Sequence, residues 1–92
     1  MQPETRFKNR VAADLKAVPD IWFQKIQQLT IRGTPDYLIC YRGKFFAWEL
    51  KVGNNKATPL QAYNLDMISK AGGVARVVTP ENYDECFKEL LG

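Results

Sequence analysis

The chain has 92 residues, of which 46% are hydrophobic and 25% are charged, and its net charge is +3. These values are typical of one globular domain, so we expect residues 1–92 to form a single domain with no membrane span. The absence of histidine excludes histidine-activated serine or cysteine nucleophiles and histidine-ligated zinc. Any acid–base or metal chemistry must therefore rely on carboxylates, lysines, tyrosines or water.

The charge is unevenly distributed along the chain. Residues 1–78 hold 12 Lys/Arg against 6 Asp/Glu, whereas residues 79–92 hold one lysine against four acids. The basic body favours a polyanionic partner such as nucleic acid. Cys40 and Cys86 are too few and too far apart for a disulfide framework, so we expect both to be buried, reduced thiols. With no apolar secretory segment at the start, these features predict an intracellular, cytoplasmic protein.

The first predicted element is a helix over residues 4–18. Apolar residues spaced by three and four positions form its inner stripe, and they are Phe7, Val11, Leu15 and Val18. The helix ends before Pro19, because the residue preceding a proline avoids the helical conformation. Residues 21–29 are predicted to form a strand, and residues 30–35 a loop that leads into the next strand.

A β-hairpin is predicted next, from two apolar, β-prone runs over residues 37–41 and 45–51 with an Arg-Gly-Lys turn between them. Apolar side chains on both faces indicate central strands that are covered on each side. If the loop has two residues, Arg42 and Gly43, then Asp36 pairs directly with Glu49. A three-residue loop centred on Gly43 would shift the pairing by one position.

Directly paired side chains share one face of a sheet, with about 5 Å between their Cβ atoms. Asp36 and Glu49 would then point into the same small volume, and Lys51 would join them because side chains two apart share a strand face. Like charges this close repel each other unless a positive charge lies between them. Carboxylate oxygens are the ligands of hard cations, so the hairpin predicts a site for a divalent ion such as Mg²⁺ or Mn²⁺.

A second helix is predicted to begin after a polar loop over residues 52–57. Thr58 is the expected N-cap, Pro59 stands at the first helical position, and Gln61 at the third completes a capping box. The helix ends at a Gly-Gly pair, residues 72–73. Its expected inner face consists of Leu60, Tyr63 or Asn64, Met67, Ile68 and Ala71.

Residues 74–78 form a short β-branched run that predicts the fourth strand, and Thr79-Pro80-Glu81 is expected to open a last helix that reaches Leu91. The order of elements is α-β-β-β-α-β-α, with three mostly antiparallel strands and a fourth reached through a helical crossover. The predicted fold class is therefore α/β, with a mixed four-stranded sheet flanked by helices.

Three motifs and their spacing resemble those of the PD-(D/E)xK nucleases, and most closely those of the virus-type replication-repair nuclease (VRR-NUC) group. They are Gly33-x-Pro35-Asp36, Glu49-x-Lys51 and Thr58-Pro59-Leu60-Gln61, followed by Ala71-Gly72-Gly73-Val74. The resemblance covers residues 4–78. It implies a restriction-endonuclease-like core and metal-dependent cleavage of DNA that leaves a 5′-phosphate and a 3′-hydroxyl. It also suggests a phage or bacterial protein that acts, like some small relatives, as a homodimeric resolvase of branched DNA such as Holliday junctions.

The resemblance implies roles for individual residues. Asp36, Glu49, the backbone carbonyl of Leu50 and Glu4 would hold the metal ion. Lys51 would act on the attacking water or the scissile phosphate, and Gln61 would orient the site. The expected contacts with DNA phosphates are Lys25, Arg32 and Lys56.

Structural alternatives exist for several of these residues. An acid such as Glu4 is favoured in any first helical turn, Lys51 can simply pair with Glu49, and Gln61 is explained by the capping box. At the level of function, the alternatives are a non-catalytic nucleic-acid-binding module and a nuclease subunit that depends on a protein partner. Such a partner could dock on the apolar side of the last helix, although packing of that side on the domain's own sheet is the favoured alternative.

Overall fold

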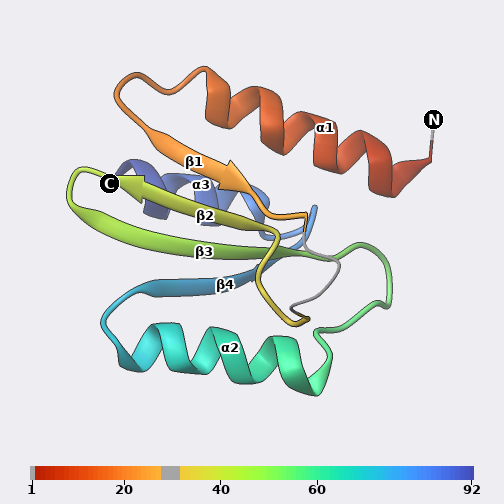
Figure 1. Cartoon of the computed structure of the whole chain (residues 1–92). Coiled ribbons are helices and arrows are strands. Elements are labelled where there is room, and N and C mark those ends of the chain that lie inside the picture. The colour runs from red at the N-terminus through yellow and green to blue at the C-terminus, as the bar shows by residue number, and fades with distance from the viewer. Residues whose placement is uncertain (1, 28–31) are drawn as a thin grey trace.

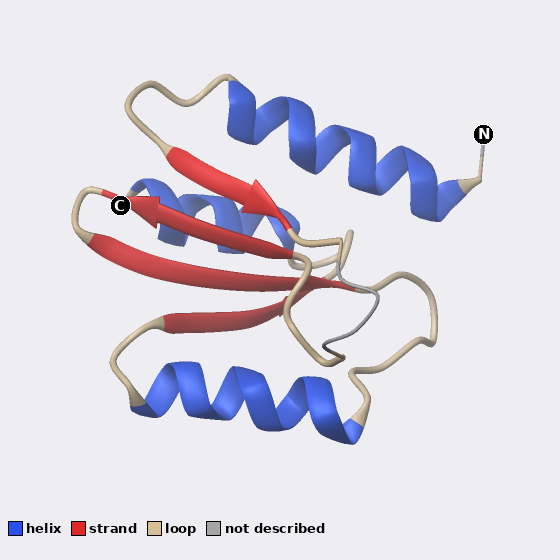
Figure 2. Cartoon of the chain, viewed as in Figure 1, coloured by secondary structure: helices blue, strands red, loops and turns tan. Residues whose placement is uncertain are grey.

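The computed structural model describes residues 2–27 and 32–92. Within these residues the order of elements is the predicted α-β-β-β-α-β-α, and the α/β fold with one mixed sheet is confirmed (Figures 1 and 2). None of the helices in this part of the chain is long and apolar enough to cross a membrane. The elements are α1 (Pro3–Lys16), β1 (Trp22–Lys25), β2 (Tyr37–Tyr41), β3 (Lys44–Leu50), α2 (Pro59–Lys70), β4 (Val74–Val78) and α3 (Tyr83–Leu91).

The four strands lie in the order β1-β2-β3-β4. Strand β2 is antiparallel to both β1 and β3, whereas β3 and β4 are parallel to each other. Parallel neighbours need a long crossover connection, and α2 supplies it. Figure 1 shows α2 running beside β4, with α3 behind the sheet and α1 next to β1.

The hairpin between β2 and β3 has the two-residue loop. Tyr41 pairs with Lys44, and both loop residues have positive φ angles, 51° at Arg42 and 80° at Gly43. Positive φ at both positions is the requirement of the type I′ turn, whose twist matches that of the strands. Because Tyr37 pairs with Trp48, the same register places Asp36 opposite Glu49.

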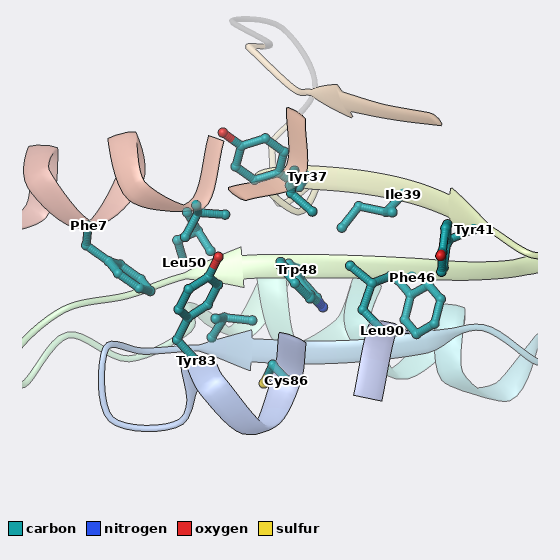
Figure 3. Close-up of a cluster of buried hydrophobic side chains, with 13 residues drawn as sticks. Phe7, Tyr37, Ile39, Tyr41, Phe46, Trp48, Leu50, Tyr83, Cys86 and Leu90 are labelled. Atoms are coloured by element: carbon teal, nitrogen blue, oxygen red, sulfur yellow. The ribbon is translucent and has the colours of Figure 1, made fainter. Parts of the chain in front are cut away.

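One face of the sheet carries the hydrophobic core, which α1 and α3 cover (Figure 3). Helix α1 contributes Phe7, Val11 and Leu15 of the predicted stripe, but it ends at Lys16, so Val18 lies beyond the helix and is only partly buried. In α3, Cys86 and Leu90 are buried, so its apolar side packs on the domain's own sheet. The buried residues of this core are Phe7, Val11, Leu15, Tyr37, Ile39, Tyr41, Phe46, Trp48, Leu50, Val78, Tyr83, Cys86 and Leu90.

Helix α2 lies against the other face, over β3 and β4. The prediction of its inner face is wrong for Leu60 and Met67, of which 47% and 46% is exposed, and for Ala71, which is exposed as well. Of the two alternatives for one inner position, Asn64 is half-buried and Tyr63 is exposed. The helix instead buries Leu65. Apolar residues occur around most of α2, so its contact with the sheet, and not its periodicity, decides which side is buried.

The β1–β2 half of this second face is less covered. Cys40 is exposed, which corrects the expectation of a buried thiol. Its direct neighbours across the strands, Trp22 and Phe45, are exposed as well. The hairpin strands are therefore central in the sheet, but they are fully covered only on the core face.

Some predicted boundaries differ from the observed ones. Strand β1 ends at Lys25, well before the predicted residue 29, although residues 28 and 29 lie outside the described residues. Helix α3 starts at Tyr83, later than predicted, because a turn comes first. In this turn Asn82 accepts a hydrogen bond from the Thr79 N–H at 2.7 Å and donates one to the Val77 carbonyl at 3.0 Å.

Candidate metal centre

Asp36 is held in place by its backbone and by its side chain. It stands at the entrance to β2, where its carbonyl accepts a hydrogen bond from the Ile26 N–H at 2.8 Å. Its carboxylate oxygen Oδ2 accepts a second hydrogen bond from the Leu50 N–H at 2.7 Å. The side chain therefore bridges to β3 beyond the last pair of the hairpin.

Glu49 is a buried carboxylate, with only 2% of the residue exposed. Its Oε2 lies 3.5 Å from the Lys51 ammonium. Its Oε1 has no hydrogen-bond partner among the described residues. A buried carboxylate oxygen without a partner is costly, so this atom marks a position where a cation would be stabilised.

The electrostatics of Glu49 follow from this position. The pKa of Glu49 is raised to about 7, first by burial and then by the neighbouring Asp36, while Lys51 acts in the opposite direction. Asp36 and Lys51 thus both lie close enough to Glu49 to act on its carboxylate. One lysine does not fully balance two carboxylates at this depth.

The oxygen atoms around the pair fit a hard divalent cation. The N–H and C=O of a strand residue point to the same neighbouring strand, so the Leu50 carbonyl faces the side on which Asp36 lies. Two carboxylates and one backbone carbonyl are the donor types that Mg²⁺ and Mn²⁺ accept. Within residues 2–27 and 32–92, no three acidic or cysteine side chains lie close enough together to hold a metal ion by themselves.

Glu4 does not join the pair. Its side chain is about half exposed and forms an ion pair with Lys8 one turn later, at 3.2 Å. The interpretation of Glu4 as part of the inward stripe is wrong, because burial on α1 begins at Phe7. Helix α1 also packs on the core face of the sheet, whereas Glu49 points to the opposite face.

Gln61 forms the predicted capping box. Its side-chain Oε1 accepts from the Thr58 N–H at 2.9 Å, and its own N–H donates to Thr58 Oγ1 at 3.2 Å. Gln61 is half-buried one turn before Leu65, so it lies on the side of α2 that meets the sheet. The capping hydrogen bonds therefore already explain why glutamine occupies this position. An orienting role at the metal site would be a second role of the same residue.

The three basic residues expected to contact DNA are all exposed. Lys25 pairs with Tyr37 across the strands and so belongs to the core face, away from Glu49. Arg32 precedes the loop that carries Asp36, and Lys56 lies in the connection from β3 to α2. The structure thus separates Lys25 from the carboxylate pair and leaves Arg32 and Lys56 in flanking loops.

Asn64 contacts the loop that precedes Asp36, which the sequence did not indicate. Its side-chain nitrogen donates to the Gly33 carbonyl at 3.0 Å and to the Leu60 carbonyl at 3.1 Å. The sequence suggested Asn64 only as one option for the inner face of the helix. A glycine ahead of Asp36 was the available signal, because glycine often marks a close approach of two segments.

The elements together define an α/β domain with one mixed four-stranded sheet, and the carboxylate pair lies on the face of that sheet opposite the core. The chain is similar to a solved structure described as a VRR_NUC domain, with a TM-score of 0.78 and 23% sequence identity. The match covers 96% of this chain and 97% of the other. No family model and no curated protein matches the sequence. The structural similarity establishes that the chain has the VRR_NUC fold.

Proposed function

We propose that the protein is a divalent-metal-dependent DNA endonuclease that hydrolyses phosphodiester bonds. The observation that carries this proposal is the buried Glu49, whose Oε1 lacks a partner among the described residues and which neighbours Asp36 and Lys51. A module that only binds nucleic acid gains nothing from two carboxylates that repel each other. The VRR_NUC fold supports the same conclusion.

Asp36, Glu49 and the Leu50 carbonyl would hold Mg²⁺ or Mn²⁺. When bound, such an ion lowers the pKa of a coordinated water and stabilises negative charge on a phosphate. Lys51 is half-buried, so its ammonium is less screened than one at the surface. From beside Glu49 it can orient the attacking water or stabilise charge on the scissile phosphate. The resemblance to PD-(D/E)xK nucleases implies a 5′-phosphate and a 3′-hydroxyl as products.

The proposed substrate is branched DNA, and the proposed assembly is a homodimer. The carboxylate pair provides one candidate active site per chain. Cutting both strands of a junction needs two sites, which a symmetric dimer supplies. A chain of 92 residues has little surface for reading bases, so recognition by phosphate contacts and DNA shape is expected. Arg32 and Lys56, in the loops that flank the carboxylate pair, are the proposed phosphate contacts.

Cleavage of a labelled four-way junction, beside a linear duplex of matched sequence, tests the function. Wild type, Asp36→Asn and Asp66→Asn are each incubated with Mg²⁺, Mn²⁺ or EDTA. Asp66 is an exposed acid on α2 that pairs with Lys70, so its variant controls for the same chemical change. Paired symmetric cuts by wild type and Asp66→Asn, absent in Asp36→Asn and in EDTA, are the expected result.

Other outcomes separate the alternatives. Equal cutting of both substrates would retain the nuclease and reject the preference for junctions, and a monomer by analytical ultracentrifugation would reject the dimer. Failure to cut either DNA, with Mn²⁺ still bound in calorimetry, would favour a subunit that needs a protein partner. Failure to bind Mn²⁺ at all would favour a non-catalytic nucleic-acid-binding module.

A further inference from the structure

The loop that carries Asp36 is attached to α2 by one side chain. The Nδ2 of Asn64 donates to the Gly33 carbonyl at 3.0 Å and to the Leu60 carbonyl at 3.1 Å. Leu60 is one turn earlier in the same helix, whereas Gly33 is 31 residues away. Asn64 therefore connects the first turns of α2 to the entrance of β2.

The chemistry of this contact is specific for an amide. A side-chain NH₂ group has two protons, and each is directed at a carbonyl oxygen. Both acceptors are carbonyls, so the orientation of the Asn64 amide is unambiguous. An aspartate at this position would place a carboxylate oxygen against two carbonyl oxygens, and an aliphatic side chain would donate to neither.

The shape of the contact is equally restrictive on the loop side. Gly33 has a φ of +82°, and a Cβ atom built on it would lie 2.8 Å from Asn64 Nδ2 and 2.5 Å from Leu60 Cγ. The backbone of the loop thus approaches α2 more closely than any residue with a side chain allows. Gly33 and Asn64 form one close contact that other side chains would disturb.

The distance along the chain from this contact to the metal site is short. Asp36 follows Gly33 by three residues, and between them Pro35 is buried and has a fixed φ. The backbone has little freedom to absorb a shift at Gly33 before it reaches Asp36. The Asn64 contact and the two hydrogen bonds of Asp36 to Ile26 and Leu50 therefore hold this segment from both sides.

We propose that Asn64 is a positioning residue for the metal site, which acts through the Gly33 carbonyl to keep the Asp36 carboxylate opposite Glu49. This inference rests on the proposed function, because it assigns Asn64 to the same site. Groups that hydrogen-bond directly to metal ligands typically contribute about 10-fold to 100-fold to metal affinity or activity, and Asn64, which acts through the backbone of Gly33, is expected at the lower end of that range. A purely structural role would instead change stability and leave metal affinity alone.

Calorimetric titration of the full chain with Mn²⁺ tests this inference without relying on cleavage. Asn64→Ala removes both donors, yet alanine is a better helix former than asparagine, so the helix itself is not weakened. The expected result is a dissociation constant for Mn²⁺ about tenfold higher than that of wild type. Ser69→Ala, which truncates an exposed polar residue of the same helix, is the control and should bind like wild type.

A second variant separates the two hydrogen bonds of Asn64. In Asn64→Ser, the hydroxyl can still donate to the carbonyl four residues earlier, that of Leu60, but it is too short to reach Gly33. Asn64→Ser is therefore expected to lose as much Mn²⁺ affinity as Asn64→Ala. If Asn64→Ala does not fold, the serine variant decides the matter by itself.

Cleavage assays supply a second, independent readout. Raising the Mn²⁺ concentration should restore cleavage by Asn64→Ala and leave Asp36→Asn inactive, because only the latter lacks a ligand. Mn²⁺ affinity unchanged in folded Asn64→Ala or Asn64→Ser, with wild type binding Mn²⁺, would overturn the positioning role alone. Absence of Mn²⁺ binding by wild type would overturn the proposed function and this inference with it.

Discussion

The carboxylate of Asp36 accepts a hydrogen bond from the backbone N–H of Leu50, with 2.7 Å between oxygen and nitrogen. This hydrogen bond connects the two strands of the hairpin one step beyond their last residue pair, Tyr37 and Trp48. It fixes one oxygen of Asp36 and turns the carboxylate toward Glu49. The hairpin thus supplies the local geometry of the carboxylate pair, and the contact of Asn64 on α2 with Gly33 holds the loop that leads into it.

The first prediction concerns the pH dependence of stability in the absence of metal. The pKa of Glu49 is raised from 4.5 to about 7, mainly by burial. Between these pH values the folded state keeps a proton that the unfolded state has lost, so the free energy of unfolding falls as pH rises. The decrease that this residue contributes amounts to about 3 kcal/mol.

Urea denaturation of metal-free protein at pH 5 and pH 8, for wild type and Glu49→Gln, measures this contribution. The variant cannot titrate at position 49, so its stability should change less between the two pH values than that of wild type. Equal changes in the two proteins would show that Glu49 keeps an ordinary pKa in the folded state.

The second prediction concerns stabilisation by metal. A divalent ion binds the ionised carboxylates, so its binding competes with protonation of Glu49. At 100 times the dissociation constant, Mn²⁺ should stabilise the fold by about 2.7 kcal/mol, which raises the Tm of a chain of this size by about 10 °C or more.

Differential scanning fluorimetry with and without Mn²⁺ checks this prediction at two pH values. The shift in Tm should be larger at pH 8 than at pH 5.5 and should be lost in Asp36→Asn. A shift of equal size in wild type and Asp36→Asn would place the bound ion elsewhere on the chain.

The third prediction concerns the close approach at Gly33. Gly33→Ala introduces a Cβ that would lie 2.5 Å from Leu60 Cγ, at a φ of +82°. Gly53→Ala is the matched control, because Gly53 also has a positive φ but has open space around it among the described residues. We expect backbone strain of about 1 kcal/mol in the control, and a cost roughly twice as large or more for Gly33→Ala, where overpacking adds to the strain.

Chemical denaturation of the two glycine variants measures the difference. Equal destabilisation would mean that backbone strain alone limits position 33 and that Leu60 moves away at no cost.

The fourth prediction concerns the hydrogen bond between α3 and α1. The buried Tyr83 hydroxyl donates to the Asp14 carboxylate at 2.7 Å, and its ring packs edge-on against Phe7 and Trp48 (Figure 3). Burial, and then Asp14, raise the pKa of Tyr83 above its ordinary value, so the hydroxyl stays protonated at neutral pH. Tyr83→Phe keeps the ring and loses the hydrogen bond, at a cost of about 1.5–3 kcal/mol.

The matched control for this change is Tyr63→Phe, since Tyr63 is exposed on α2. Thermal and urea unfolding should show a clear loss of stability for Tyr83→Phe and almost none for Tyr63→Phe. If the two variants were equally stable, the Asp14 hydrogen bond would contribute nothing beyond what water supplies.

Much of the candidate site was predictable from the sequence because its geometry depends on interactions between residues that are close in the chain. The Arg42-Gly43 loop fixes the register of the hairpin through its turn type, and the register brings Asp36 opposite Glu49. The alternation of side chains along β3 then adds Lys51 to the same face. The capping box of Thr58 and Gln61 is also local, because its two hydrogen bonds lie within one helical turn.

Other features are not encoded in any short stretch of the chain. Helix α2 has apolar residues on several sides, so only its contact with the sheet could select Leu65 over Leu60 and Met67. Cys40 is exposed because α2 covers β3 and β4 and leaves the β1–β2 half of that face less covered. Glu4 has the right spacing for the inner stripe of α1, yet it precedes the first residue that the core buries.

By itself, the sequence determined the order of the elements and narrowed the hairpin register to two alternatives, one of which pairs Asp36 with Glu49, because turn chemistry, strand alternation and helix capping act between residues close in the chain. Only the tertiary structure decided which side of α2 is buried, that Glu4 and Lys25 lie away from the pair, and that Asn64 holds the loop of Gly33. Those outcomes depend on how whole elements pack against one another. Packing brings together residues that are far apart in the sequence, and no local sequence pattern indicates such contacts.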